Sequence, residues 1–227
     1  MKKFLKLTTV VVSMVMALAF VSCANGSTSN DGNENSDDGK LNLVGTYGIS
    51  KVEELYKDSD QDVAITMTMP TSTSFREYGT IKSINGDTTS VQEMDVTVTK
   101  TSNGYSFNWA KYNVDGVAQG ADAKAAMEAT FDDDSWNNMT AQFAMTITTT
   151  AEGTWSANDT PASSGTFTVD ESNSKVTITI LIEGGTTLTE PEEIEASYSN
   201  NGKTLVVVQD YSSDVETYKS TITFTRK

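Results

Sequence analysis

The sequence predicts an all-β fold, with an antiparallel β-barrel favoured over a β-sandwich as the alternative. Apolar and polar residues alternate along many segments beyond residue 40. This period of two indicates strands with one buried and one solvated face, as in antiparallel sheets. Turns rich in Gly, Asn and Asp separate the segments, as hairpins require. We expect about eight to ten strands in a meander, with one short helix.

Six segments alternate most clearly, at residues 63–69, 94–98, 105–109, 143–147, 176–182 and 218–224. Turn sequences lie between or beside them at residues 85–87, 102–104, 170–173 and 200–202. From Gly153 onward, strand follows turn at spacings that suit neighbouring strands of one sheet. Residues 41–227 are therefore expected to form one β domain.

Residues 121–129 break the alternation, because they are rich in alanine and contain no β-branched residue. Such residues have high helix propensity, so this segment predicts the short helix. A single helical turn is also expected at residues 53–57, which read Glu-Glu-Leu-Tyr-Lys.

The first 22 residues have the organisation of a secretory signal peptide. Lys2, Lys3 and Lys6 precede a largely apolar run over residues 7–20, and small residues follow it. A transmembrane helix needs about 20 consecutive apolar residues, and this run is shorter. We expect residues 1–22 to be removed during export.

The residues Phe20-Val21-Ser22-Cys23 resemble the lipobox of bacterial lipoproteins, and Cys23 is the single cysteine of the chain. The resemblance implies a diacylglyceryl thioether on Cys23, cleavage before it, and acylation of the new amino group by a chain such as palmitate. Ala24, in the position after the cysteine, favours the outer membrane, on its periplasmic or surface face. The alternative is an ordinary signal peptide cut elsewhere, which would leave a free thiol.

The segment that follows the cysteine predicts a tether. Residues 24–40 contain no aromatic or large aliphatic side chain, so they cannot bury enough surface to offset the entropy of ordering. Together, residues 23–40 are expected to be a lipidated, disordered tether that links the membrane to the domain. Removal of the signal peptide takes away three lysines and no acid, so the formal charge changes from −15 to −18. This acidity argues against nucleic acid as a partner.

Two parts of the domain resemble lipocalin-like barrels. The sequence Leu43-Val44-Gly45-Thr46-Tyr47 resembles their first-strand signature, with Tyr in place of Trp, and residues 218–227 resemble their closing strand. The segments Gly153-Thr-Trp155 and 165–170 are similar to a short meander of bacterial lipocalin-like lipoproteins. The resemblance implies a lipocalin-like barrel over residues 41–227, in which Arg226 packs across Tyr47 and closes the barrel. The alternative is that both are core and rim residues of an unrelated sandwich.

Composition restricts the chemistry. The chain has no histidine and one cysteine, which excludes an internal disulfide, a Cys-based zinc site and Ser-His or Cys-His catalysis. The densest carboxylate clusters, at residues 132–134 and 190–193, are expected to be solvated faces rather than metal or catalytic sites. We expect no enzyme activity, no cofactor and no metal.

The aromatic residues Tyr105, Phe107 and Trp109 lie on one face of one predicted strand. They are candidates for the wall of an apolar pocket, although core packing is the simpler interpretation. The leading expectation is a monomeric envelope lipoprotein that binds a small hydrophobic ligand in a β-barrel. The alternatives are a surface-exposed structural or interaction protein, such as an antigen or adhesin, and, less favoured, a carboxylate-based hydrolase.

Overall fold

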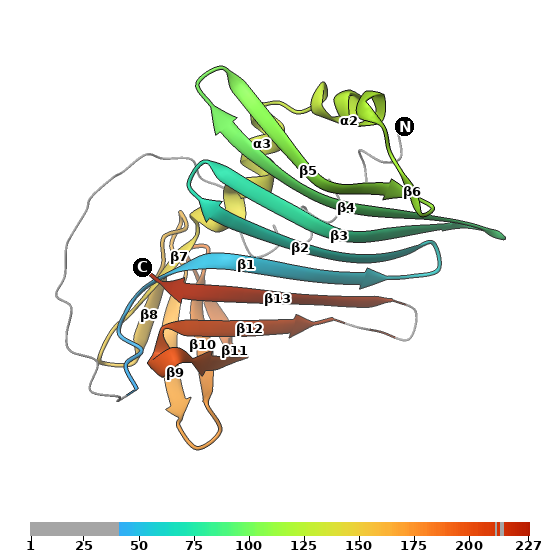
Figure 1. Ribbon diagram of the computed structural model, residues 1–227. Coiled ribbons are helices and arrows are strands. Elements are labelled where there is room, and N and C mark those ends of the chain that lie inside the picture. The colour runs from blue at the N-terminus through green and yellow to red at the C-terminus, as the bar shows by residue number, and fades with distance from the viewer. Residues whose placement is uncertain (1–40, 212, 214–215) are drawn as a thin grey trace. The chain divides into compact units, whose positions relative to one another are not determined.

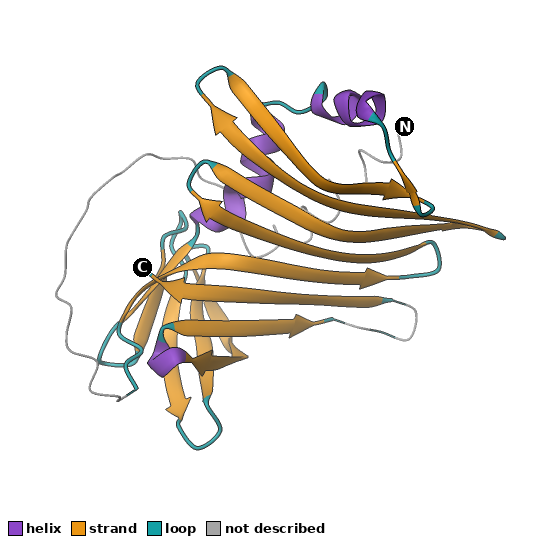
Figure 2. Ribbon diagram, in the orientation of Figure 1, coloured by secondary structure: helices purple, strands orange, loops and turns teal. Residues whose placement is uncertain are grey.

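The computed structural model describes residues 41–211, 213 and 216–227. The expected signal peptide, Cys23 and the tether lie outside the described residues. Figure 1 shows the chain coloured from the N-terminus to the C-terminus, and Figure 2 distinguishes its strands, helices and loops. Strands dominate the described part, as the alternation predicted.

The strands are β1 (Gly45–Lys57), β2 (Gln61–Thr71), β3 (Ser74–Asn85), β4 (Thr88–Thr101), β5 (Gly104–Val114), β6 (Val117–Ala118), β7 (Thr146–Thr149), β8 (Thr154–Ala157), β9 (Ser164–Asp170), β10 (Lys175–Glu183), β11 (Thr186–Ser199), β12 (Thr204–Asp210) and β13 (Thr217–Arg226). The helices are α2 (Ala121–Glu128) and α3 (Asp133–Thr140), with short 3-10 segments η1 (Ala141–Ala144) and η2 (Asn200–Gly202).

Strand pairing closes a barrel. The strands β7 to β13 pair in sequence order, β7 also pairs with β1, and β13 pairs with β1. These eight strands form a closed antiparallel ring, which confirms the predicted barrel and its meander rather than the sandwich alternative. The strands β2 to β6 continue the sheet beyond β1, again in sequence order.

The chain divides into two compact units, and each has its own core. The described part of the first unit comprises residues 41–48, 145–205 and 225–227. Its buried side chains include Tyr47, Ile147, Val176, Ile180 and Leu205. In β10, Val176 and Ile180 are buried while Lys175 and Leu181 are exposed, which is the pattern expected of a strand with one covered face.

The second unit comprises residues 49–144 and 206–224, and it holds most of the sheet formed by β1 to β5. One side of this sheet, which we call the inner face, carries apolar residues at alternate positions of each strand. Its buried members include Val52, Val63, Ile65, Met67, Phe75, Ile81, Met94, Val96 and Val98. The burial alternates along β2 and β4 as their sequence predicted.

The opposite side, the outer face, is charged and polar. There Arg76 donates from Nε and Nη2 to the two carboxylate oxygens of Asp95, at 2.9 and 2.8 Å. Lys111 lies 2.7 Å from Glu93 on the same face. These pairs join neighbouring strands at exposed positions, where each contributes only modestly to stability.

Two expectations about helices need correction. The helical turn expected at residues 53–57 is wrong, because these residues form the end of β1 and pair with residues 62–66 of β2. Pairing with β2 outweighs the helix propensity of the Glu and Leu residues in this segment. One short helix was expected, and α2 matches it, but α3 is a second one. Its N-terminus is capped by Asp132, whose carboxylate accepts from the Ser135 backbone N–H at 2.8 Å.

Candidate functional site

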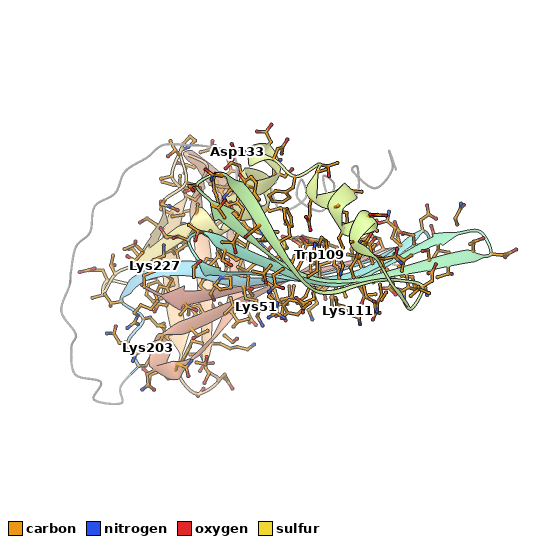
Figure 3. All side chains as sticks on the ribbon, turned by 45° about the horizontal axis from the view of Figure 1, so that its top comes forward. Lys51, Trp109, Lys111, Asp133, Lys203 and Lys227 are labelled. Carbon is orange, nitrogen blue, oxygen red and sulfur yellow. The ribbon has the colours of Figure 1, made fainter. Side chains whose placement is uncertain are left out.

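The strongest candidate site lies on the inner face of the second unit. The strand register places Val52, Met67, Glu77, Val96 and Trp109 in one row across β1 to β5. Because side chains in such a row share one face of the sheet, Trp109 stands on the same side as the apolar core. Figure 3 shows Trp109 on the side of the sheet that carries the helices, with Lys111 on the other side.

The predicted aromatic stripe is brought together with side chains from the helical segment. The ring of Phe131 lies 4.9 Å from that of Tyr105 and 5.3 Å from that of Phe107, both edge to face. Trp136 of α3 lies 5.6 Å from Tyr105. Phe107 and Trp109 are nearly parallel, with an interplanar angle of 14° and centroids 6.5 Å apart. These distances are typical of interacting aromatic pairs.

Tyr112 extends the stripe further than its sequence period predicts. Strict alternation after Trp109 would bring Lys111 to the inner face. A β-bulge between Asp95 and Val96 shifts the register, so that Tyr112 lies opposite Met94 and its ring lies 5.3 Å from Trp109. We call the set Tyr105, Phe107, Trp109, Tyr112, Phe131 and Trp136 the aromatic face.

The aromatic face is only partly covered. Trp136 is buried, whereas the other five residues are half-buried. Helix α2 contributes no buried residue, and its N-terminus has no side-chain cap. The Trp109 indole N–H donates to the Glu128 carboxylate at 2.8 Å, which ties the end of α2 to the sheet. The aromatic face therefore has solvent-accessible apolar rings beside α2, a helix that buries no side chain.

Polar groups stand at one end of the aromatic face. The Tyr105 hydroxyl donates to Asp133, and the Lys100 ammonium lies 3.2 Å from the same carboxylate. That ammonium is also 5.7 Å from the Tyr105 ring and 5.9 Å from the Trp136 ring. The Tyr105 hydroxyl and the Lys100 ammonium hold the pKa of Asp133 below its usual value.

Tyr47 and Arg226 lie together in the first unit. The Arg226 guanidinium carbon is 5.4 Å from the Tyr47 ring centroid, and Nη2 donates to the Tyr47 hydroxyl at 3.0 Å. Tyr47 is fully buried, and its hydroxyl reaches the carbonyls of Leu43 at 3.1 Å and Gly202 at 2.6 Å. The contact joins the two ends of the domain, which fits a structural role rather than ligand binding.

The two carboxylate clusters singled out from the sequence lie on exposed positions. Residues 132–134 form the cap and first turn of α3, and the acidic residues of 190–193 lie on β11. Within the described ranges, no three Asp, Glu, His or Cys side chains are grouped so as to hold a metal ion. None of the helices in the described part of the chain has the length and apolar character to cross a membrane.

Comparison with known proteins gives no match to a protein-family model, to a curated protein or to a solved structure. Sequence reasoning found the three residues of the stripe but not Tyr112, Phe131 and Trp136. The last two come from the segment between α2 and η1, and no strand period links them to β5.

Proposed function

We propose that this protein is a non-enzymatic lipoprotein of the bacterial cell envelope that binds a small apolar ligand at the aromatic face. The observation that carries the proposal is the continuous surface of six aromatic rings, five of which are only half-buried. Rings that served only as core packing would be expected to be buried throughout. Flat apolar rings with a few polar groups at one end are typical of small-molecule sites.

The position of the aromatic face changes where the ligand is expected. β5 is not one of the eight strands that close the ring. We therefore place the proposed site on the inner face of the second unit, between β5 and the helical segment, rather than inside the ring. Helix α2, with no buried side chain and one indole–carboxylate bond to the sheet, is suited to move aside when a ligand enters.

The lipoprotein part of the proposal rests on the sequence. The order of basic residues, apolar run, small residue and Cys23 supports lipidation, and two or three acyl chains hold a protein firmly at a bilayer. The net charge of −18 expected after removal of the signal peptide would keep the domain away from anionic lipid. The ligand site would then face the aqueous phase of the envelope.

Lipidation is tested by growing cells that express the full chain with an alkyne-labelled fatty acid. The wild-type chain is expected to be labelled and to sediment with membranes, whereas Cys23→Ala should lose the label and be released. A control substitution in the same region, Ser22→Ala, keeps a small residue before the cysteine and should keep the label. Equal labelling of Cys23→Ala and wild type would contradict lipidation.

Ligand binding is tested with the mature chain, residues 23–227, carrying Cys23→Ser so that no lipid competes. Its sheet content is first checked by circular dichroism. Nile red, a neutral apolar dye, is expected to bind saturably and to increase in fluorescence. Phe107→Ala should weaken binding about tenfold, which corresponds to about 1.4 kcal/mol. Phe167→Ala, a half-buried phenylalanine of β9, is the matched control and should leave binding unchanged. Equal effects of the two substitutions would contradict the assigned site.

A further inference from the structure

The inner face contains a polar patch that the fold itself does not explain. Glu54 of β1 is 2% exposed and Glu77 of β3 is 9% exposed, although both stand among apolar side chains. On β13, Ser220 is 1% exposed, and Tyr218 stands beside it with its pKa raised to about 12 by burial and by the Glu54 carboxylate. We call Glu54, Glu77, Tyr218 and Ser220 the polar patch.

One carboxylate oxygen of the polar patch, Oε2 of Glu54, is fully covered and has no hydrogen-bond partner. The Ser220 Oγ is also fully covered, and its contact with the Tyr218 hydroxyl is not a hydrogen bond of ordinary geometry. A buried polar atom without a hydrogen-bond partner destabilises the folded state. Buried polar groups without a partner are rare in native proteins, and binding of a further group is one explanation for them.

Among the residues that the structure describes, no basic side chain forms an ion pair with Glu54 or Glu77. In the described strands β1 to β4, Lys100 alone among the basic side chains takes an inner-face position, and it pairs with Asp133. Lys51 and Arg76 lie on the outer face and pair with Glu53 and Asp95. Burial raises the pKa of Glu54 and of Glu77 to about 7, and for Glu54 the nearby Glu77 adds to the shift.

The register links the polar patch to the aromatic face. Glu77 and Trp109 occupy the same cross-strand row, with Val96 between them. Glu54 begins the neighbouring row, which continues through Ile65, Gly79 and Met94 to Tyr112. Two strand spacings, about 10 Å, separate Glu77 from the aromatic strand. Glu77 thus shares a row with Trp109, and Glu54 shares a row with Tyr112, on the same face of the sheet.

We propose that Glu54 and Glu77 bind the ammonium group of an amphipathic amine whose apolar body extends along the inner face to the aromatic rings. An ammonium offers three donors and a positive charge, which suits two buried carboxylates. The apolar strip between them suits an aliphatic or aromatic body. This inference specifies the ligand class and, for the apolar end, rests on the proposed function.

The test compares three probes of equal chain length, octylamine, octanol and octanoate, by calorimetric titration of the lipid-free mature chain at about pH 8. Octylamine is expected to bind at least tenfold more tightly than octanol, and octanoate more weakly than either. Glu54→Gln and Glu77→Gln should each remove the preference for the amine. Glu53→Gln, the neighbouring acid on the outer face, is the matched control and should preserve it.

Octanol binding without any amine preference, or a preference that survives both glutamine variants, would overturn the amine site. Octylamine binding that depends on Glu54 and Glu77, with no binding of octanol or Nile red, would support the amine site and contradict the apolar site of the proposed function. Since Gln is close in shape to Glu and carries no buried charge, both variants are expected to fold, as circular dichroism would verify.

Discussion

Glu77 of β3 and Trp109 of β5 are both register partners of Val96, so a buried carboxyl and a half-buried indole flank one valine in the same row. This arrangement places charge and aromatic surface on one side of a sheet that is otherwise apolar. The sheet alone does not require it, because a valine or leucine at position 77 would pack there at lower cost.

Stability is expected to fall as the pH rises from about 5 to about 8. A glutamate in the unfolded chain has a pKa of about 4.3, whereas Glu54 and Glu77 in the folded chain have a pKa of about 7. Between these values the folded state holds more protons, so the free energy of unfolding decreases with pH, by roughly 2 to 3 kcal/mol per carboxyl. Urea unfolding of the mature chain across this range measures the effect.

Other carboxyls act in the opposite direction at lower pH. Arg76 lowers the pKa of Asp95, and Lys111 lowers the pKa of Glu93. The stability that these two carboxylates provide is therefore lost as the pH falls below about 4. The stability maximum is therefore expected near pH 5. Replacing Glu54 and Glu77 together by Gln should flatten the decline above pH 5, while Glu53→Gln should leave it in place. A wild-type protein equally stable at about pH 5 and pH 8 would contradict the burial of this pair.

Trp109→Phe is expected to loosen α2 without unfolding the sheet. Phenylalanine keeps a ring on the aromatic face but removes the indole N–H that donates to Glu128 at 2.8 Å. Since α2 buries no side chain, little else holds it. Hydrogen exchange at residues 121–128 should become several-fold faster, with a thermal midpoint close to that of wild type. Trp155→Phe removes an indole bond in the other unit and should not change exchange in α2.

Asp132→Ala is expected to destabilise α3. The Asp132 carboxylate accepts from both the backbone N–H and the hydroxyl of Ser135, which satisfies a free donor of the first turn. Asp134→Ala removes an equal charge from the same turn without removing the cap and is the matched control. Amide exchange over residues 133–140 should accelerate more in Asp132→Ala. Equal acceleration in the two variants would show that charge, not capping, holds this helix.

Tyr47→Phe is expected to lower the free energy of unfolding by about 1 to 3 kcal/mol. The substitution removes the buried 2.6 Å donor to the carbonyl of Gly202 and the part-buried acceptor for Arg226. Tyr56→Phe is the comparison, because that hydroxyl donates to the carboxylate of Asp58 at a part-buried position. Chemical denaturation should show a larger loss for Tyr47→Phe, and an equal or smaller loss would contradict its closing role.

Much of the fold was predictable because its strands alternate. The segments around Val63 and Val176 display a period of two, and each proved to be a strand with the expected buried positions. The strand at residues 53–57 was not predictable, because Glu and Leu favour helix in isolation. The pairing with β2 that outweighs this preference is not visible in the local sequence. The burial of Glu54, which is 2% exposed, likewise has no sequence signal.

The candidate site was predictable only where it follows one strand. Tyr105, Phe107 and Trp109 share a face because they alternate. Tyr112 joins them through a bulge, and Phe131 through the turn after α2, so neither follows from a strand period. The spacing between Glu77 and Trp109 depends on the order of β3, β4 and β5, which is a property of the sheet.

Ligand binding at the aromatic face is tested most directly by NMR of the indole N–H groups. The chain has three tryptophans, of which Trp109 and Trp136 belong to the aromatic face and Trp155 lies in the other unit. Octanol is titrated into the lipid-free mature chain and the three indole resonances are followed. The Trp109 and Trp136 resonances are expected to shift and saturate together while that of Trp155 stays unchanged. A shift of the Trp155 resonance alone, or no shift at saturating octanol, would contradict binding at the aromatic face.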